Sequence, residues 1–525
     1  MTPSNSSASL RRALRALDEA GIPHAYFKDP AGLGQALQGG PKDYDLLVAP
    51  ASRARAEAIL RDGGLKQAHS FAVPPVPATS DWLGFDTETG ALHHLHLHAL
   101  LPTGKDALRD YALPWADALL EHRRLHPDHQ VWVLSDALNL LILLLRTCVE
   151  QKFARHDTSP WAPTAQSVAR LLELRALASR DEVLTLAGAL LGEPFARGMA
   201  SWLDPSLSGT PAIHELMRLR PLVLNALKPY RRFHPAGAQA RRRTRQLKLL
   251  AGAAARKTPL PLPPRRRGLR LPHKGLIIAV IGPDGAGKST LTEALNAWLS
   301  QLIDTRQLYL GKGDPVSAAW QSLARAKWWA LETFTHRQRP PAPEVPAPSP
   351  GGELDTPELP DLDPDQVLRY TPPPERSAGR QLMRDMAWVS LAGRHLFNTR
   401  RAAFAATRGA LVVADRFPFQ ASHLASGPSI PSDPEQPLNR RVFALAEDAL
   451  FKSLQNTPPD LILRLNISPE IAWRRKPDHD IVDIASKALA LQSIDPGSAT
   501  LIDLDATLPP EVLLNQAKAA IWEAL

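Results

Sequence analysis

The sequence predicts an α/β fold whose C-terminal half contains a five-stranded parallel sheet covered by helices. Two observations predict it. Short apolar runs in this half alternate with helix-like patterns, and one run leads through a glycine-rich loop straight into a helix-like segment. The chain has 525 residues, more than one hydrophobic core supports, so we expect several domains. An α+β region and then a mostly helical region are expected before the sheet domain.

The composition divides the chain into four expected parts. They cover residues 1–130 (α+β), 131–230 (helical), 231–274 (a basic linker) and 275–525 (the sheet domain). A proline-rich insertion at 338–375 interrupts the last part, because the 12 prolines from Pro340 to Pro374 exclude a helix or a central strand. We expect this insertion to be disordered.

The basic linker carries the charge of the whole chain. Residues 231–274 hold 14 basic and no acidic side chains, so removing these 14 charges from the net +9 leaves −5 on the rest. Like charges combined with Pro and Gly are typical of an extended linker. Binding of nucleic acid or anionic lipid at this linker stays open as the alternative to a merely solvated segment.

Cysteine usage and apolar runs bear on location. Cys148 is the single cysteine, so no intramolecular disulfide can form, which indicates a reducing compartment. The N-terminus lacks an apolar signal core, and the longest apolar run, from Ala137 to Leu145, is too short to span a bilayer. We therefore predict a cytoplasmic protein without a transmembrane segment. A homodimer is left open.

Individual elements follow from local patterns. In the N-terminal half we expect a helix over Leu10–Ala20, a strand over Ala25–Lys28, and a long helix from Asp136 with Ser135 as its N-cap. The five strands expected in the sheet domain are Leu276–Ile281, Gln307–Leu310, Ala410–Ala414, Leu461–Ile467 and Leu501–Leu504.

The strongest local signal is GPDGAGKST, which matches G-x-x-x-x-G-K-[ST] between a predicted strand and a predicted helix. Glycines let the backbone turn tightly and bring its N–H groups to phosphate oxygens, and the following helix presents its positive end. Lys288 would contact the β and γ phosphates of ATP, Ser289 would supply a hydroxyl to Mg²⁺, and Thr290 would face the α phosphate. The candidate nucleotide-binding residues of this loop are Gly282, Asp284, Gly285, Ala286, Gly287, Lys288, Ser289 and Thr290.

A second signal ends the third predicted strand. Four apolar residues, Leu411 to Ala414, lead into Asp415, the pattern of a carboxylate that holds Mg²⁺ beside the phosphates. In a parallel sheet this carboxylate lies at the same edge as the glycine-rich loop. The next residue, Arg416, points to a phosphate or carboxylate partner.

Three segments together resemble a known family. GPDGAGKST, ADRF at 414–417 and PDLILRLNISPE at 459–470 occur in the order seen in thymidylate kinases, so the chain from about 275 to 525 resembles a thymidylate kinase-like P-loop kinase. The resemblance implies transfer of the γ-phosphoryl group of ATP to a nucleoside monophosphate, with Mg²⁺ between the phosphates. It also implies that Asp284 lies near the acceptor sugar, and that Arg394 and Arg416 bind the acceptor phosphate.

The resemblance also implies a mobile lid after the fourth strand. One version of the family has an arginine in the phosphate loop, where this chain has Gly285 and Ala286, so a cation must come from elsewhere. Arg474 and Arg475 stand at the place of the lid and would offset charge on the transferring phosphoryl group. A solvated basic helix face is the alternative. No segment matches the residues that select thymine, which leaves the acceptor open.

The segment from Tyr26 to Val48 resembles a nucleotidyltransferase fold. Asp43 and Asp45 would share one face of a strand, as two-metal chemistry requires. A third carboxylate is expected on a later strand, but the plausible one carries His94, His96 and His98 instead. Those histidines could bind metal, although such histidines are more often structural. A binding or regulatory module is the more economical interpretation.

Three functions remain for the whole chain. The first is a nucleoside monophosphate kinase. The second is a kinase of another small phosphorylated metabolite, such as a sugar phosphate of polysaccharide assembly, and the third is a non-catalytic ATP-binding adaptor. Arg394, Arg416 and Arg474 favour an enzyme, because an adaptor needs no cations around an acceptor phosphate.

Overall fold

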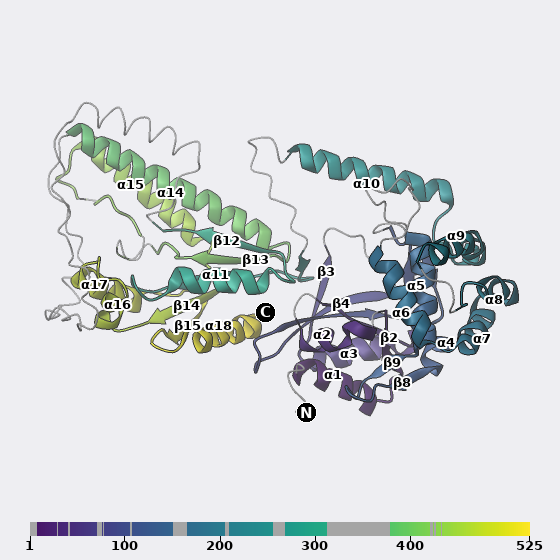
Figure 1. The fold of residues 1–525 in the computed structure, drawn as a ribbon. Coiled ribbons are helices and arrows are strands. Elements are labelled where there is room, and N and C mark those ends of the chain that lie inside the picture. The colour runs from purple at the N-terminus through teal and green to yellow at the C-terminus, as the bar shows by residue number, and fades with distance from the viewer. Residues whose placement is uncertain are drawn as a thin grey trace. The chain divides into compact units, whose positions relative to one another are not determined.

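The computed structural model divides into two compact units, Met1–Pro272 and His273–Leu525 (Figure 1). The proline-rich insertion predicted at 338–375 lies outside the described residues. The residues that the structure describes are 8–28, 30–39, 42–70, 76, 78–104, 108–150, 165–204, 209–255, 268–311, 378–419, 424, 427–431 and 433–525.

The first unit is built on an eight-stranded mixed sheet with the order β10-β3-β4-β5-β2-β1-β9-β8. Its strands are β1 (His24–Tyr26), β2 (Tyr44–Val48), β3 (Lys66–Ser70), β4 (Thr79–Phe85), β5 (Leu92–His98), β8 (Arg123–Leu125), β9 (Trp132–Leu134) and β10 (Leu269–Arg270). A separate two-stranded sheet pairs β6 (Leu101–Thr103) with β7 (Tyr111–Leu113).

Helices cover both faces of this sheet. Three of them pack on Leu46 and Val48 of β2: α1 (Ala8–Glu19), α2 (Leu33–Gln38) and α3 (Arg53–Asp62). The others share a core with Leu47, which points to the opposite face because side chains alternate along a strand. They are α4 (Ala116–Glu121), α5 (Asp136–Glu150), α6 (Ala165–Leu177), α7 (Arg180–Leu191), α8 (Glu193–Met199) and α9 (Gly209–Ala226), with short 3-10 turns η1 (Pro30–Gly32), η2 (Pro50–Ser52) and η4 (Lys228–Tyr230) elsewhere in the unit.

The prediction of an extended linker over 231–274 is wrong, because much of this segment is the helix α10 (Pro235–Ala255). Proline suits the first turn of a helix, and the Arg, Ala, Gln and Leu residues that follow are good helix formers. Arg242 forms an ion pair with Asp110, and Arg232 donates to the Arg109 carbonyl at 2.9 Å. Strand β10, near the end of the segment, pairs antiparallel with β3, so the described residues up to Pro272 belong to the first unit.

The second unit confirms the predicted five-stranded parallel sheet, with the order β12-β13-β11-β14-β15. β11 and β13 are buried along their whole length, which explains why they stand out in the sequence as continuous apolar runs. The strands are β11 (Ile277–Ile281), β12 (Thr305–Tyr309), β13 (Leu411–Asp415), β14 (Leu461–Asn466) and β15 (Thr500–Asp505).

Helices again lie on both faces. Ala279 and Ile281 of β11 share a core with α14 (Ala378–Ala406), α15 (Leu438–Gln455) and α17 (Ile481–Gln492), and Figure 1 shows α14 and α15 side by side. α11 (Lys288–Leu299) and α18 (Pro510–Ala524) contact each other and the strands from the other face. α16 (Pro469–Arg475) follows β14. In the part of the chain that the structure describes, every helix is too short or too polar to cross a bilayer.

The strand order locates the candidate site. β11 lies between β13 and β14. After β11 the chain continues to β12 at one edge of the sheet, whereas after β14 it continues to β15 at the other edge. Ligands of open parallel sheets bind outside the carboxyl ends of the strands at such a switch point. The glycine-rich loop follows β11 and therefore lies there.

Candidate functional site

The glycine-rich loop turns sharply between β11 and α11. Gly285 has φ 84° and Gly287 has φ 88°, values in the left-handed region that favour glycine. A Cβ atom on Gly285 would also lie 2.3 Å from the carbonyl oxygen of Ala472 in α16. Glycine is thus required at Gly285 by both conformation and space, and α16 packs directly on the loop.

Lys288 is buried at the start of α11. Its ammonium donates to the Pro283 carbonyl oxygen at 2.6 Å and lies 3.7 Å from the Asp284 carboxylate. Burial lowers the pKa of Lys288 to about 8, and the charge of Arg416 acts in the same direction. A buried ammonium forms stronger hydrogen bonds with anionic oxygens than with a neutral backbone carbonyl, so Lys288 is suited to bind phosphate.

Ser289 and Asp415 meet at the edge of the sheet. The Ser289 hydroxyl donates to Asp415 Oδ2 at 2.7 Å. The other carboxylate oxygen, Oδ1, is buried and has no hydrogen-bond partner among the described residues. A hydroxyl beside a carboxylate with an unpaired buried oxygen is a donor set that suits Mg²⁺, which prefers oxygen ligands. The predicted metal residues therefore fit this ion.

Asp284 is surrounded by cations. Its carboxylate accepts from Arg416 Nη2 at 3.0 Å and from Lys487 Nζ at 2.7 Å, with His479 at 3.9 Å. Burial alone would raise the pKa of Asp284, but the Lys487 hydrogen bond and the charges of Lys288, Lys487 and Arg416 hold it well below its usual range. Three cationic side chains thus gather around Asp284, while Asp483 also contacts Lys487 and Asp415 lies near Lys288, so phosphate oxygens could replace Asp284 as partners of these cations.

Arg416 has an unusual backbone conformation directly after β13. Its φ of 69° lies in the left-handed region, which few residues other than glycine adopt. Its backbone N–H donates to the Val280 carbonyl of the neighbouring strand at 3.0 Å. Left-handed backbone at a non-glycine residue costs energy and gathers at functional sites, so this conformation supports a role for Arg416 in the site.

The sequence does not predict Lys487 as a site residue. It lies on α17, where it also bonds Asp483 one turn earlier at 2.7 Å. The spacing of Asp483 and Lys487 is a usual helical ion pair, so the sequence offered a surface explanation and no signal for the site. The contact with Asp284 depends on how α17 folds back onto the loop.

The predicted lid and acceptor arginines lie on two other helices. The Arg475 guanidinium donates to the Ala506 carbonyl after β15 at 3.0 Å, and Arg474 is exposed on α16. Arg394 is half-buried on α14 next to the buried His395. Burial lowers the pKa of His395 to about 4, and the charge of Arg394 adds to this effect. The roles of all three arginines remain proposals.

Two hollows flank the loop. A cleft of about 320 Å³ opens at the carboxyl ends of β14 and β15, and a much smaller cavity of about 20 Å³ lies among the cations around Asp284. The cleft is lined by Pro283, Asn466, Ser468, Gln492, Asp505 and Thr507, among others. Only the cleft has the size of a small-molecule site.

A second polar cluster lies in the first unit. Asp43 precedes β2 and contacts His94, whereas Asp45 contacts His98, so the two predicted carboxylates are engaged by different histidines. The sequence predicts a third carboxylate for this cluster, and β5 carries none. Asp81 of β4 supplies one, because β4 pairs with β5 and places Asp81 opposite His96.

No model of a known protein family matches this chain. A protein of Escherichia coli K12 called uncharacterized ATP-binding protein YghR is 28% identical over 257 residues, which cover 47% of this chain and 86% of that protein. A second K12 protein, uncharacterized ATP-binding protein YghS, is 23% identical over 251 residues, or 47% of this chain and 93% of that protein.

Proposed function

We propose that the unit His273–Leu525 is an ATP-dependent phosphotransferase that transfers the γ-phosphoryl group to a nucleoside monophosphate. The observation that carries the proposal is the Ser289–Asp415 hydrogen bond at the edge of the sheet, beside the cations around Asp284. The names of the two E. coli relatives support ATP as the nucleotide.

ATP would bind across the glycine-rich loop. The loop N–H groups and the positive end of α11 face the phosphates, and Lys288 exchanges the Pro283 carbonyl for β and γ phosphate oxygens. The adenosine part occupies the cleft at β14 and β15. Ser289 and Asp415 would hold Mg²⁺, which when bound neutralises charge on the phosphates.

The acceptor would bind on the β13 side of the loop. Arg416 and Arg394 hold its phosphate, and Asp284 faces its sugar. Lys487 takes the place of the arginine that the loop lacks, because its ammonium contacts the same carboxylate as Arg416. Charge fixed in this way before the reaction stabilises the transferring group. Arg474, which is exposed on α16, would add a further positive charge near the transferring phosphoryl group.

One screen tests the proposal. The purified full chain is incubated with ATP, Mg²⁺ and a panel of nucleoside monophosphates and sugar phosphates, and ADP release is measured. Release that depends on a nucleoside monophosphate supports the proposal. Release with sugar phosphates alone favours the other phosphorylated acceptor, and ATP binding without any acceptor-dependent release favours the adaptor.

Asp415→Asn should raise the Mg²⁺ concentration that ATP binding requires. The substitution keeps the shape and the Ser289 contact but removes the negative charge. Loss of one charge-assisted contact should raise the half-saturating Mg²⁺ concentration by about 10- to 100-fold. Mg²⁺ titrations of ATP binding measure it, with Asp448→Asn on α15 as the matched control, since Asp448 pairs with Lys452. An unchanged Mg²⁺ requirement would remove Asp415 from the metal site.

Nucleotide affinity should fall as the pH rises above about 8. Burial lowers the pKa of Lys288 to about 8, so the ammonium is present below this pH and must be regained by proton uptake on binding above it. The affinity then falls by up to about tenfold per pH unit. Binding measured from pH 6.5 to 9.5 tests this, and Lys288→Arg should flatten the profile because arginine stays charged. A flat wild-type profile would contradict the assignment of Lys288 to the phosphates.

A further inference from the structure

A cluster of imidazoles and carboxylates crosses three neighbouring strands of the first unit. Asp45 of β2 and Asp81 of β4 both lie directly opposite His96 of β5. Because residues in one row share a face of the sheet, the three side chains project to the same side. His98 follows on that face two residues later. The function proposed for the second unit uses none of these residues.

The donor atoms converge on one point. His98 Nε2 lies 3.0 Å from Asp45 Oδ1, and His96 Nδ1 lies 3.5 Å from the same oxygen. One ligand atom each from Asp45, His96 and His98 lies within 4.8 Å of the other two. The histidine ring centroids are 4.0 Å apart, so both imidazoles face the same place. His98 is buried and Asp45 and His96 are half-buried, which limits competition from water.

A carboxylate lies behind one of these histidines. His96 Nε2 is 3.9 Å from Asp81, beyond hydrogen-bond distance but on the side where metal-binding histidines commonly have a carboxylate partner. His94 differs, because Asp43 at 2.7 Å and Asp81 at 2.8 Å occupy both of its nitrogens. His94 therefore fixes Asp81 in place and is not free to be a ligand.

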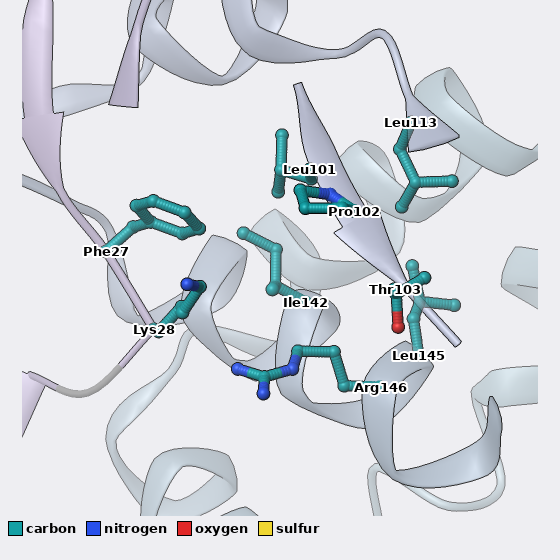
Figure 2. A pocket seen from close by; sticks show the side chains of 9 residues that line it. All are labelled: Phe27, Lys28, Leu101, Pro102, Thr103, Leu113, Ile142, Leu145 and Arg146. Carbon is teal, nitrogen blue, oxygen red and sulfur yellow. The ribbon is translucent and has the colours of Figure 1, made fainter. Parts of the chain in front are cut away.

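A cationic side chain, Lys28, lies at the donor atoms of the cluster. Its ammonium contacts Asp45 and lies 3.1 Å from His98 Nε2, so it competes for the atoms that a metal ion would use. Figure 2 shows Lys28 and Arg146 at an adjacent cavity with apolar walls. That cavity holds about 10 Å³, about the volume of one water, so it is too small for an organic molecule.

We propose that Asp45, His96 and His98 bind a divalent transition-metal ion of the zinc class, with Lys28 displaced from Asp45. Two imidazoles and one carboxylate suit Zn²⁺ or Co²⁺, whereas Mg²⁺ prefers oxygen ligands alone. The site therefore differs from the paired carboxylates, Asp43 and Asp45, that the sequence predicts for two-metal chemistry. Three protein ligands leave a fourth position for water or a further ligand.

The test uses the full chain after removal of metal with a chelator. Zn²⁺ is titrated by calorimetry and Co²⁺ by its visible absorption, in an Asp415→Asn background that removes the carboxylate from the proposed metal site of the second unit. One ion with the intense absorption of four-coordinate Co²⁺ is expected. His96→Gln and His98→Gln should each lower the affinity at least about 10-fold, and Asp81→Asn by about 10- to 100-fold. His214→Gln, an exposed histidine on α9, is the matched control.

Several outcomes would overturn the proposal. They are the absence of binding to the unmutated site, and histidine variants that bind as tightly as the His214 control. Binding seen only after Lys28→Met would show that the ammonium fills the site in the native chain, and it also overturns the proposal. X-ray absorption of the Zn²⁺-loaded chain avoids reliance on variants that fail to fold, because scattering from two imidazoles is expected and scattering from oxygen alone contradicts it.

Discussion

Replacing Lys288 with Ala should lower ATP turnover by about 100- to 1000-fold while leaving the fold of the second unit intact. Removing one preorganised charge that faces the reacting group has this order of effect in other enzymes. The fold should tolerate the change, because burial disfavours the charged lysine and its contacts, with Pro283 and Asp284, lie within the loop itself. ADP release measures the loss of turnover, and thermal unfolding of the same preparation measures whether the fold is intact.

Lys452→Ala is the matched control for this experiment. Lys452 is an exposed lysine on α15 that pairs with Asp448, and such surface pairs contribute at most about 1 kcal/mol. Its variant should turn over ATP as the unmutated chain does. Turnover at the control level in Lys288→Ala would mean that the glycine-rich loop does not bind the reacting phosphates.

The parts of the fold that the sequence predicts well are those fixed by local pattern. β14 is apolar except for Arg464 and Asn466, so its apolar run predicts the fourth strand at Leu461–Ile467, and the strand is found at Leu461–Asn466. The helix α10 was not expected, because the charge pattern of its segment suggested an extended chain. The Asp110 carboxylate that pairs with Arg242 is 132 residues away in the chain, and no local pattern indicates it.

The candidate sites also combine residues in local motifs with residues that are distant in the sequence. The loop residues and Asp415 lie in contiguous motifs, and their mutual contact follows from the order of parallel strands. Lys487 reaches Asp284 across 203 residues, and Asp81 joins the histidines only through strand pairing. Contacts of this kind depend on tertiary folding, so a single sequence carries no sign of them. The acceptor also stays a proposal, because neither motifs nor the two E. coli relatives name one.

Arg416→Ala should separate a phosphotransferase from an ATP-binding adaptor. Alanine keeps the Cβ atom, so the left-handed backbone at φ 69° and its bond to Val280 are retained and the fold is expected to survive. The guanidinium, which donates to Asp284 at 3.0 Å, is lost from the side of the loop where we propose that the acceptor binds. ATP affinity should therefore change little. Acceptor-dependent ADP release should fall by about 10- to 150-fold, the equivalent of about 1.5 to 3 kcal/mol for one charge-assisted contact.

The conservative variant sharpens this result. Arg416→Lys should recover only part of the lost rate, because an ammonium cannot reproduce the planar two-donor contact of a guanidinium with phosphate. Arg394→Ala should behave as Arg416→Ala does if both arginines hold the acceptor, and Arg441→Ala, an exposed arginine on α15, should have no effect. ATP affinity and ADP release are measured for all four variants. Loss of ATP binding in Arg416→Ala and Arg394→Ala would assign these arginines to the donor site or to the fold, because a residue that holds only the acceptor has no contact with ATP to lose.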